Sequence, residues 1–384
     1  MNILEEIQSC SVEWKELGEV CEIETGKLNA NESVEDGKYP FFTTAKEISR
    51  INSFRWNTEA LLIAGNANVG DVKYYSGKFE AYQRTYVLTN FSHNVKARFL
   101  LHIVKQGLKS YLENNTNKAA MSYIVISTLK SFPIPIPPIE IQEKIVQILD
   151  KMTEYVTELT SELTSRKKQY SFYRDKLLSF EDEVYQVEWK KLSECLKKGK
   201  GTKITASQMK LLHKDGAPIR IFAGGKTYAD VNYGDIPDKD IHTEEAIVVK
   251  SRGIIDFEYC TEPFSFKNEF WSYSSDNENI NLRYVYHYLV YNKGHFQNIA
   301  NNMQMPQISS NDTEKYKIPV PSLEIQSRIV QVLDNFDTVC NDLNIGLPKE
   351  IELRQKQYEY FRDKLLTFVA EGEYTDSTVQ TRHH

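Results

Sequence analysis

The sequence of 384 residues contains few cysteines, and their spacing fits no disulfide framework. Cys10, Cys21, Cys195, Cys260 and Cys340 are odd in number, far apart and without a C-x-x-C pair, which excludes a disulfide-stapled fold and a zinc ribbon. We therefore expect a reducing, cytoplasmic location. The N-terminus lacks the basic start and apolar stretch of a secretion signal, and no run of 18 apolar residues occurs, so we expect no membrane span.

The sequence also lacks the motifs of common enzyme classes. Gly225-Lys226-Thr227 would end a P-loop, but Arg220 stands where the first glycine is needed. There is no H-E-x-x-H, no G-x-S-x-G and no Asn/Asp/Ser-Pro-Pro-aromatic loop of an adenine methyltransferase. The eight histidines form no cluster. We therefore predict a binding protein without a catalytic residue, metal or cofactor of its own.

The composition is that of a soluble globular protein, with 41% hydrophobic and 26% charged residues. The length corresponds to two or three domains at roughly 150 residues each. The net charge of -6 argues mildly against a nucleic-acid partner. The acidic excess lies outside residues 13–132 and 188–317, however, so each of these near-neutral segments can still present a basic face.

The chain repeats itself, which determines its architecture before any single motif does. The repeated segments are Val12–Leu17 with Val187–Leu192, Ile134–Gln142 with Ile318–Gln326, and Arg166–Phe180 with Arg354–Phe368. The second pair is offset by 184 residues and the third by 188, so the second copy carries four extra residues. Each half thus consists of a variable globular segment followed by a nearly duplicated helical segment.

Each helical segment follows a proline-rich stretch and carries apolar residues at spacings of three and four, the 3.5-residue period of a coiled-coil seam. The predicted packing positions are Ile141, Ile145, Ile148, Met152, Leu159 and Leu163 in the first helix, and Ile325, Ile329, Val332, Phe336 and Leu343 in the second. Gly346-Leu347-Pro348 should kink or break the second helix. Since neither helix can bury its stripe alone, we expect an antiparallel pair with a globular domain at each end. The alternative is two ordinary domain-capping helices.

The globular segments mix strands and helices. Short β-branched or aromatic runs between Gly and Asn turns predict strands, and longer apolar runs predict helices. We expect strands at 60–64, 69–75, 85–89, 246–250, 253–259 and 264–266, and helices at 99–108 and 282–291. Tyr284, Tyr288 and Tyr291 share one face of the last helix, where packing is the expected role.

These observations predict an α+β fold with an internal pseudo-two-fold repeat: two mixed α/β globular domains joined by two long antiparallel coiled-coil helices. The predicted parts are globular domains at 1–133 and 187–317, helical regions at 134–186 and 318–372, and a disordered tail at 373–384. Whether His383-His384 at the end of that tail are native is left open.

Two copies of one globular unit suit a ligand that repeats along a line, as duplex DNA does. Half-sites one helical turn apart lie about 34–36 Å from each other, and a pseudo-two-fold protein can contact both. Asn, Gln, Arg and Lys supply hydrogen bonds to bases and phosphates. The candidate DNA-binding residues are Lys46, Arg50, Asn66, Asn68, Lys73, Tyr74, Gln83 and Arg84 in the first segment, and Lys226, Lys250, Arg252, Lys267, Asn268 and Trp271 in the second.

The layout resembles the specificity subunit of type I restriction–modification systems. The resemblance rests on the two Ile-Pro-x-Pro-x-x-Glu-x-Gln runs, each entering a long helix, and on Met121–Ser127 and Met305–Asn311, which look like the segments that close each target recognition domain. It implies that each globular domain reads one half of a split DNA target. It also implies that modification (methyltransferase) subunits and restriction (ATP-dependent translocase and nuclease) subunits supply the chemistry, while this chain supplies none.

Other interpretations stay open at this stage. A coiled-coil scaffold with protein- or glycan-binding ends would ignore DNA, and an independent nuclease or methyltransferase would be active alone. The doublet Thr157-Glu-Leu-Thr-Ser-Glu-Leu-Thr164 is either a spacer device or an incidental amphipathic repeat. The amino-acid sequence does not indicate which DNA sequence is recognised or how long its spacer is. Nor does it indicate the partner stoichiometry or whether the free subunit forms oligomers.

Overall fold

The structure is a computed structural model that describes residues 3–115, 123–180, 187–300 and 306–368. The chain divides into two compact units. Unit 1 combines residues 1–159 with 351–384, and unit 2 spans residues 160–350. Each unit therefore holds one globular segment and parts of both helical regions. The domain boundaries given above stay a prediction, and the predicted tail with His383-His384, like Met121 and Met305, lies outside the described residues.

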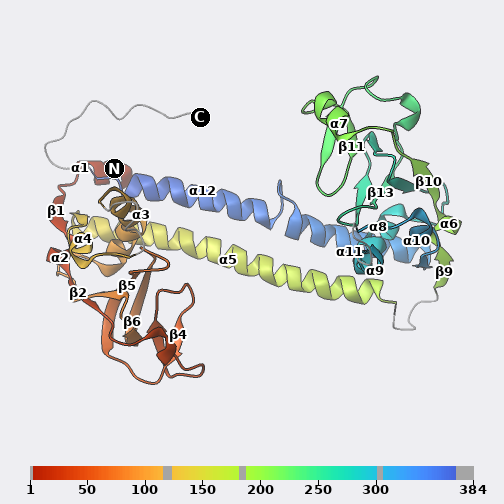
Figure 1. The fold of residues 1–384 in the computed structure, drawn as a ribbon. Coiled ribbons are helices and arrows are strands. Elements are labelled where there is room, and N and C mark those ends of the chain that lie inside the picture. Colours follow the sequence, from red (N-terminus) through yellow and green to blue (C-terminus); the bar gives the residue numbers. More distant parts are fainter. Residues whose placement is uncertain (1–2, 116–122, 181–186, 301–305, 369–384) are drawn as a thin grey trace. The chain divides into compact units, whose positions relative to one another are not determined.

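Unit 1 is built around one mixed sheet with the strand order β2-β7-β5-β6-β3-β4 (Figure 1). The strands are β2 (Glu22–Thr25), β3 (Tyr39–Phe42), β4 (Ser49–Ile51), β5 (Trp56–Ala64), β6 (Val72–Ala81) and β7 (Thr85–Thr89). The helices of its globular part are α1 (Ile3–Ser9), α2 (Leu17–Val20), η1 (Ala30–Glu32), α3 (Ala97–Asn115) and α4 (Ile126–Lys130). Only β3 and β6 pair in parallel within this sheet; the other pairs are antiparallel.

Unit 2 repeats this plan with the sheet divided in two. Its strand orders are β10-β16-β13-β14 and β12-β11-β15. The strands are β10 (Lys197–Lys200), β11 (Ile219–Phe222), β12 (Tyr228–Val231), β13 (Ala246–Lys250), β14 (Asp256–Cys260), β15 (Phe264–Phe266) and β16 (Trp271–Ser274). The helices of its globular part are α6 (Leu192–Cys195), α7 (Ala206–Leu212), η3 (Asp238–Asp240), α8 (Leu282–Tyr291), α9 (Lys293–Ala300) and α10 (Ser310–Glu314).

The division of the second sheet has a local cause. Strand β6 of unit 1 runs for ten residues and bridges the two halves of its sheet. Its counterpart in unit 2 is interrupted between β14 and β15, where Pro263 lies. Because proline has no backbone N–H, it cannot continue a ladder of hydrogen bonds inside a sheet. One strand of unit 1 thus becomes two strands in unit 2, while the order of the strands is retained.

A two-stranded ribbon in each unit accounts for two of the sequence repeats. Strand β1 (Glu13–Glu16) pairs with β8 (Pro133–Ile136), and β9 (Glu188–Lys191) pairs with β17 (Lys317–Val320). The Val-Glu-Trp-Lys segments and the proline-rich segments are therefore antiparallel partners. A two-stranded ribbon consists only of edge strands, which is where prolines are tolerated.

The long helices begin directly after these ribbons. Helix α5 (Ile139–Leu178) is continuous over 40 residues, or about 60 Å at 1.5 Å per residue. The second helical region is divided into α11 (Leu323–Asn341) and α12 (Leu347–Leu365). The predicted break at Gly346-Leu347-Pro348 is confirmed. The four extra residues of the second copy lie between Asp334 and Arg354, the interval that includes the linker between α11 and α12. Pro348 stands in the first turn of α12, where its missing N–H costs nothing.

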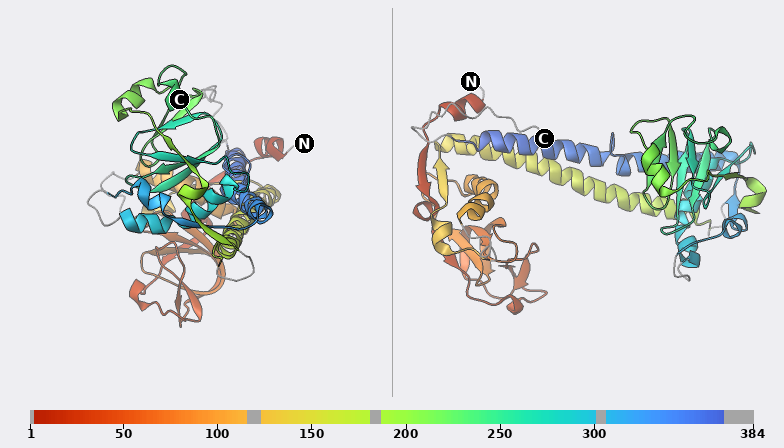
Figure 2. Two further views of the ribbon diagram at one scale, coloured as in Figure 1. Left: turned by 90° about the vertical axis from the view of Figure 1, so that its right-hand side faces the viewer. Right: turned by 45° about the horizontal axis from the view of Figure 1, so that its top comes forward.

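Within unit 1, α12 runs alongside the first part of α5 (Figures 1 and 2). Leu365 is buried in the same hydrophobic cluster as Ile145 and Leu149 of α5, and Tyr358 packs against that cluster. Within unit 2, Phe336 of α11 stacks on two rings of α5, with centroid distances of 5.9 Å to Tyr170 and 5.7 Å to Tyr173. Both units therefore contain helix–helix packing.

The packing positions predicted from the 3.5-residue period fall into three groups. Ile141, Ile145 and Ile329 are buried, but within the globular cores of their units. Two predictions are wrong: Val332 is 37% exposed and Leu343 is 71% exposed. Leu333 takes the buried position beside Val332 because α11 packs on α8, and Leu343 lies in the linker, outside any helix. The remaining positions are half-buried: Ile148, Met152, Leu159, Leu163, Ile325 and Phe336.

The predicted globular elements are present as β5, β6, β7 and α3 in unit 1 and as β13, β14, β15 and α8 in unit 2. Strand β6 begins at Val72 instead of residue 69, because the residues before it form a turn. Tyr284 and Tyr288 are buried in the core of unit 2, as expected for packing residues, whereas Tyr291 is half-buried. Each core joins sheet, helix and the first turns of a long helix in one cluster.

Candidate nucleic-acid interface

Three loops of unit 1 meet at one end of its sheet. They are the hairpin loop (residues 43–48, between β3 and β4), the turn (residues 65–70, after β5) and the third loop (residues 82–84, before β7). Asn68 Nδ2 of the turn donates to Thr44 O of the hairpin loop at 2.7 Å. The backbone N–H of Gly65 donates to Arg84 O at 2.8 Å. These bonds tie the three loops together. We call the surface that the three loops of a unit form its three-loop surface.

Unit 2 has the same three loops at equivalent places: 223–227, 251–254 and 267–269. Lys267 N donates to Phe222 O at 3.1 Å, as Tyr82 N donates to Phe42 O at 2.9 Å in unit 1. Ser251 Oγ donates to Glu269 O at 2.7 Å, replacing the backbone bond between the turn and the third loop. Ala67 and Gly253 occupy equivalent positions in the turns, and both have positive φ angles, 56° and 73°.

In unit 1, six of the eight predicted residues lie on or directly behind the three-loop surface. Lys46, Gln83 and Arg84 are exposed. Gln83 Nε2 donates to Asn29 Oδ1 at 3.0 Å. The other members are Asn66, Asn68 and Lys73.

In unit 2, Lys226, Arg252, Lys267 and Asn268 lie on the three-loop surface, and Lys250 lies directly behind it, where its Nζ donates to Gly225 O at 2.9 Å. Lys226 occupies the tip of the hairpin, and Arg252 and Asn268 are exposed. Lys267 pairs with Glu269 at 2.6 Å. Burial alone would raise the pKa of Glu269, but hydrogen bonds from this ammonium group and from its own backbone N–H, together with the charges of Lys267 and Arg252, hold the pKa below its ordinary value.

Three predicted residues do not belong to this surface. Arg50 of β4 turns to the opposite end of the hairpin, where its guanidinium donates to Gly37 O at 2.9 Å and Lys38 O at 3.1 Å. Trp271 is buried in the core of unit 2, where its indole N–H donates to Thr313 Oγ1 at 3.1 Å. Tyr74 lies on the opposite face of β6 from Lys73, since neighbouring residues of a strand point to opposite sides. Its hydroxyl donates to Glu59 at 2.8 Å, and its ring lies under the Arg98 guanidinium. Both aromatic residues therefore serve the architecture of their units.

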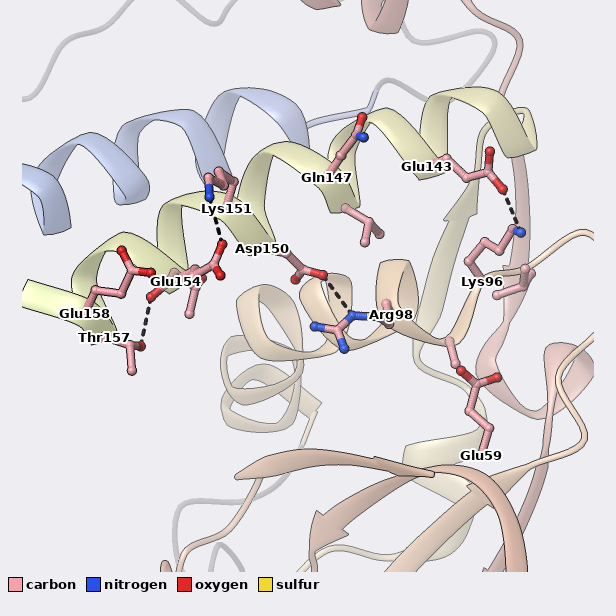
Figure 3. A pocket seen from close by; sticks show the side chains of 14 residues that line it. Glu59, Lys96, Arg98, Glu143, Gln147, Asp150, Lys151, Glu154, Thr157 and Glu158 are labelled. Atoms are coloured by element: carbon pink, nitrogen blue, oxygen red, sulfur yellow. Dashed lines mark hydrogen bonds and ion pairs between the residues drawn. The ribbon is translucent and has the colours of Figure 1, made fainter. Parts of the chain in front are cut away.

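A groove of about 1180 Å³ lies where the globular part of unit 1 meets α5, and Glu59 and Arg98, the two partners of Tyr74, are among its lining residues (Figure 3). The charged lining pairs internally: Lys96 with Glu143 at 2.7 Å, Arg98 with Asp150 at 2.8 Å, and Lys151 with Glu154 at 3.0 Å. Glu59 and Glu158 remain as an acidic excess. This groove would repel a phosphate backbone, which separates it from the three-loop surface.

A buried amide joins each globular part to its long helix, and sequence reasoning gave it no role. Gln142 is fully buried; its Oε1 accepts from Lys96 N at 2.9 Å, and its Nε2 donates to the carbonyls of Asn94 and Pro137 at 2.8 and 2.9 Å. Gln326 of unit 2 repeats all three bonds with Asn281 N, Asn279 O and Pro321 O. The glutamine that ends each Ile-Pro-x-Pro-x-x-Glu-x-Gln run was the available signal.

A second part of this joint is an Asp that binds an Arg and a His. In unit 1, Asp150 accepts from Arg98 and lies 3.0 Å from His102 Nε2. In unit 2, Asp334 accepts from Arg283 at 2.9 Å and lies 2.7 Å from His287 Nε2. We call the glutamine and this triad together the joint of each unit.

The joint perturbs the acid–base behaviour of its members. Burial lowers the pKa of His102 and His287, although the neighbouring carboxylates oppose this effect. Burial alone would raise the pKa of Asp334, but hydrogen bonds from Arg283 and His287 keep it below its ordinary value.

Among the described residues, no group of three or more His, Cys, Asp or Glu side chains could hold a metal ion. Within the same part of the chain, no helix is long and apolar enough to cross a membrane.

Comparison with known proteins gives one consistent family. The family model described as "Type I restriction modification DNA specificity domain" matches twice, at residues 11–166 and 186–353. The Escherichia coli EcoR124I/EcoR124II specificity subunit is 37% identical over 260 residues, covering 62% of this chain and 63% of that protein, which is less than two thirds of its length. A Mycoplasma pneumoniae protein assigned as type I specificity subunit S.MpnORF507P is 28% identical over 372 residues, covering 91% and 96%.

A solved structure shares the fold. The S subunit of a type I restriction-modification system from M. genitalium superposes with a TM-score of 0.69, covering 94% of this chain and 98% of that one. The sequence identity of this pair is 18%, so the likeness concerns the architecture alone.

Proposed function

Because the chain belongs to the type I restriction–modification DNA specificity family, we propose that it recognises a bipartite duplex target, with one half-site read by each unit. The observation that carries this proposal is the three-loop surface, which occurs once in each unit. Eleven of the fourteen candidate residues lie on this surface or directly behind it, all except Arg50, Tyr74 and Trp271. Lys, Arg, Asn and Gln are the residues that bind phosphates and base edges. The acidic groove beside α5 lies elsewhere and suits no phosphate.

We propose that the chain itself performs no catalysis and that modification and restriction subunits supply it. A protein-docking role is supported by exposed aromatic residues that occur once in each unit. Trp14 and Trp189 stand at equivalent places on the ribbons, opposite Pro135 and Pro319, and are 40% and 48% exposed. Trp is enriched among residues that dominate interface energies. A pair of equal aromatic patches suits two copies of one partner.

The repeated Arg166–Phe180 and Arg354–Phe368 segments supply a second such pair. Phe172 on α5 and Tyr360 on α12 are equivalent in the repeat, and both are mainly exposed. We propose that these rings extend the docking surface onto the helices. The Thr157–Thr164 doublet lies within α5, where adding four residues would lengthen the helix by about 6 Å; this supports its proposed use as a spacer element.

The five cysteines are free thiols. This supports a reducing, cytoplasmic location, which remains part of the proposal.

Two measurements test the proposed function. Binding of the full-length chain to duplex DNA should weaken steeply with salt, because each neutralised phosphate releases a counterion. A protein or glycan scaffold would ignore DNA at every salt concentration. In addition, the host should lose one methylated bipartite sequence when the gene is deleted and regain it on complementation. An unchanged methylome would contradict the proposal, and nuclease or methyltransferase activity of the purified chain alone would contradict its non-catalytic part.

A further inference from the structure

The hairpin loops of the two units carry a lysine at the same place. Lys46 is the fourth residue after the end of β3, and Lys226 is the fourth after the end of β11. Both side chains are exposed, and neither ammonium group makes a hydrogen bond or ion pair with another described residue. The hairpins otherwise differ, with Thr-Thr-Ala before the first lysine and Ala-Gly-Gly before the second.

A second lysine holds each hairpin from behind. In unit 1, Lys73 Nζ donates to Ala45 O at 3.0 Å and pairs with Asp71 at 2.6 Å. In unit 2, Lys250 Nζ donates to Gly225 O at 2.9 Å and pairs with Glu258 at 2.5 Å. In both units the carbonyl that is held belongs to the residue directly before the exposed lysine.

The two holding lysines do not correspond in sequence. Lys73 comes from β6, whereas Lys250 comes from β13, the counterpart of β5. The ammonium group is thus in the same place although a different strand supplies it. A buried charge is costly unless it is paired and hydrogen-bonded, and the Lys250 side chain is only 4% exposed. Each unit holds the hairpin carbonyl with a lysine, although a different strand supplies that lysine and burying its charge is unfavourable. The recurrence of this arrangement points to a role in fixing the hairpin.

The exposed arginines of the surface behave differently from the exposed lysines. Arg84 in the third loop of unit 1 has Glu269 as its counterpart, and Arg252 in the turn of unit 2 has Asn66 as its counterpart. Neither guanidinium bonds to another described residue. Each unit therefore presents one exposed lysine that has a counterpart in the other unit and one exposed arginine that has none.

From this contrast we infer a division of labour: Lys46 and Lys226 bind DNA phosphates independently of sequence, Lys73 and Lys250 position them, and Arg84 and Arg252 read bases. Two domains that read different half-sites need the same phosphate contact but different base contacts. Arginine binds guanine edges with two parallel hydrogen bonds, whereas phosphate contacts carry no direct sequence information. This inference rests on the proposed function and assigns roles within it.

The first test measures how the binding of the full-length chain to DNA depends on salt. Two fluorescent duplexes are compared: one carries the bipartite sequence identified in the host methylome, and the other carries a scrambled sequence of equal composition. K46A and K226A should each reduce the slope of log K against log salt by about 0.9. They should weaken both duplexes alike and leave their affinity ratio unchanged. R84A and R252A should lower that ratio by about 5- to 150-fold, the effect of losing one good base contact. In the host methylome, each arginine variant should relax one half-site only.

Matched controls are K144A in unit 1 and K198A in unit 2, because Glu6 and Glu314 already neutralise these exposed lysines. Both should leave slope and ratio unchanged. If the wild-type chain binds duplex DNA with a clear preference but K46A and K226A keep the full slope, or change the ratio, the inference is wrong while the proposed function stands. If the wild-type chain binds neither duplex, both fall.

The positioning role is tested by double-mutant cycles. K250M should reduce the salt slope as K226A does, and the double variant should add nothing further, because the two residues act on one contact. A merely structural role would lower thermal stability but leave the slope of the folded protein intact. K73M with K46A repeats the test in unit 1, where the holding lysine is more exposed and its loss is better tolerated. Additive slopes in both cycles would overturn the positioning role.

Discussion

The two units attach their long helices with the same residues but present different residues to solvent at the three-loop surface. The joint repeats Gln142 as Gln326 and Asp150 as Asp334, with the same bonds. The loops repeat the backbone bond from the third loop to the strand before the hairpin, replace the bond between the turn and the third loop, and exchange Thr44 for Gly224 and Arg84 for Glu269. Buried polar groups need every partner, so one solution is retained. Exposed loops carry no such demand and can change. The comparison separates the part that fixes geometry from the part that can carry specificity.

The largest expected effect concerns the buried glutamines of the joint. Gln326→Ala removes three hydrogen bonds and takes this partner away from the half-buried N–H of Asn281, the carbonyl of Asn279 and the buried carbonyl of Pro321. At about 1–3 kcal/mol for each unsatisfied group, partly relieved by relaxation, we expect unit 2 to lose roughly 3 kcal/mol of unfolding free energy. Hydrogen exchange of α8 and α11 measures this loss within the unit.

Gln142→Ala should cost unit 1 the same amount, since the bonds are the same. The exposed Gln147 and Gln331, on the same helices, are the matched controls and should change stability by less than about 0.5 kcal/mol. A clear difference between the costs of the two glutamine variants would break the equivalence of the two joints.

The next effect concerns the exposed tryptophans. Trp14→Ala and Trp189→Ala should each weaken association with the modification subunits by about 2 kcal/mol, or about 30-fold, if they act as interface anchors. Their own unit should remain folded, because both side chains are largely exposed. Titration of labelled full-length chain with purified modification subunits checks the affinity, and circular dichroism checks the fold. Unaltered affinity in both variants would remove the ribbons from the proposed docking surface.

The third effect is a loss of stability in mild acid that both units should share. His102 and His287 have pKa values below the ordinary value of 6.5, so the unfolded chain binds protons there that the folded chain does not. The free energy of unfolding should therefore fall as pH drops below about 6.5. At lower pH, Asp334 adds a loss in unit 2, because its contribution is present above its ordinary pKa of 3.8 and disappears as pH falls through its lowered value.

Urea denaturation at several pH values measures this dependence, with hydrogen exchange assigning it to a unit. His102→Gln and His287→Gln should each flatten the decline below pH 6.5 in their own unit. The decline would persist in the double variant if other groups caused it.

The smallest effect is expected for the exposed rings on the helices. Phe172→Ala and Tyr360→Ala should change the stability of the free chain by no more than about 0.5 kcal/mol, because neither side chain is part of a core cluster. A larger loss measured by thermal unfolding would assign these rings to packing instead of docking.

The repeat made much of the architecture predictable. Because the motif residues recur at a fixed offset, the two-fold plan, the long helices and the break at Gly346-Leu347-Pro348 followed from the sequence. The periodicity was a weaker guide within α11, since Leu333 turns toward α8 and leaves Val332 exposed. Tertiary packing against α8 determines which of the two neighbouring residues is buried. A sequence period of 3.5 residues does not contain this information.

The sequence predicted most of the residues at the candidate interface but not the role of each residue there. Lys73 and Tyr74 could not both face one surface, since adjacent strand residues point apart. Trp271 could be recognised as a core residue only once Thr313 lay beside its indole N–H. The equivalence of Lys73 and Lys250 was invisible to alignment, because different strands bring the two ammonium groups to the same place.

The most direct measurement of the central claim is a segment exchange read out by methylome sequencing. Residues 13–132 are replaced by the corresponding segment of a family member with a different target, and the hybrid gene is expressed in a host lacking its own copy. If each unit reads its own half-site, one half of the methylated sequence changes and the other half is retained. Changes in both halves of the methylated sequence would contradict the account.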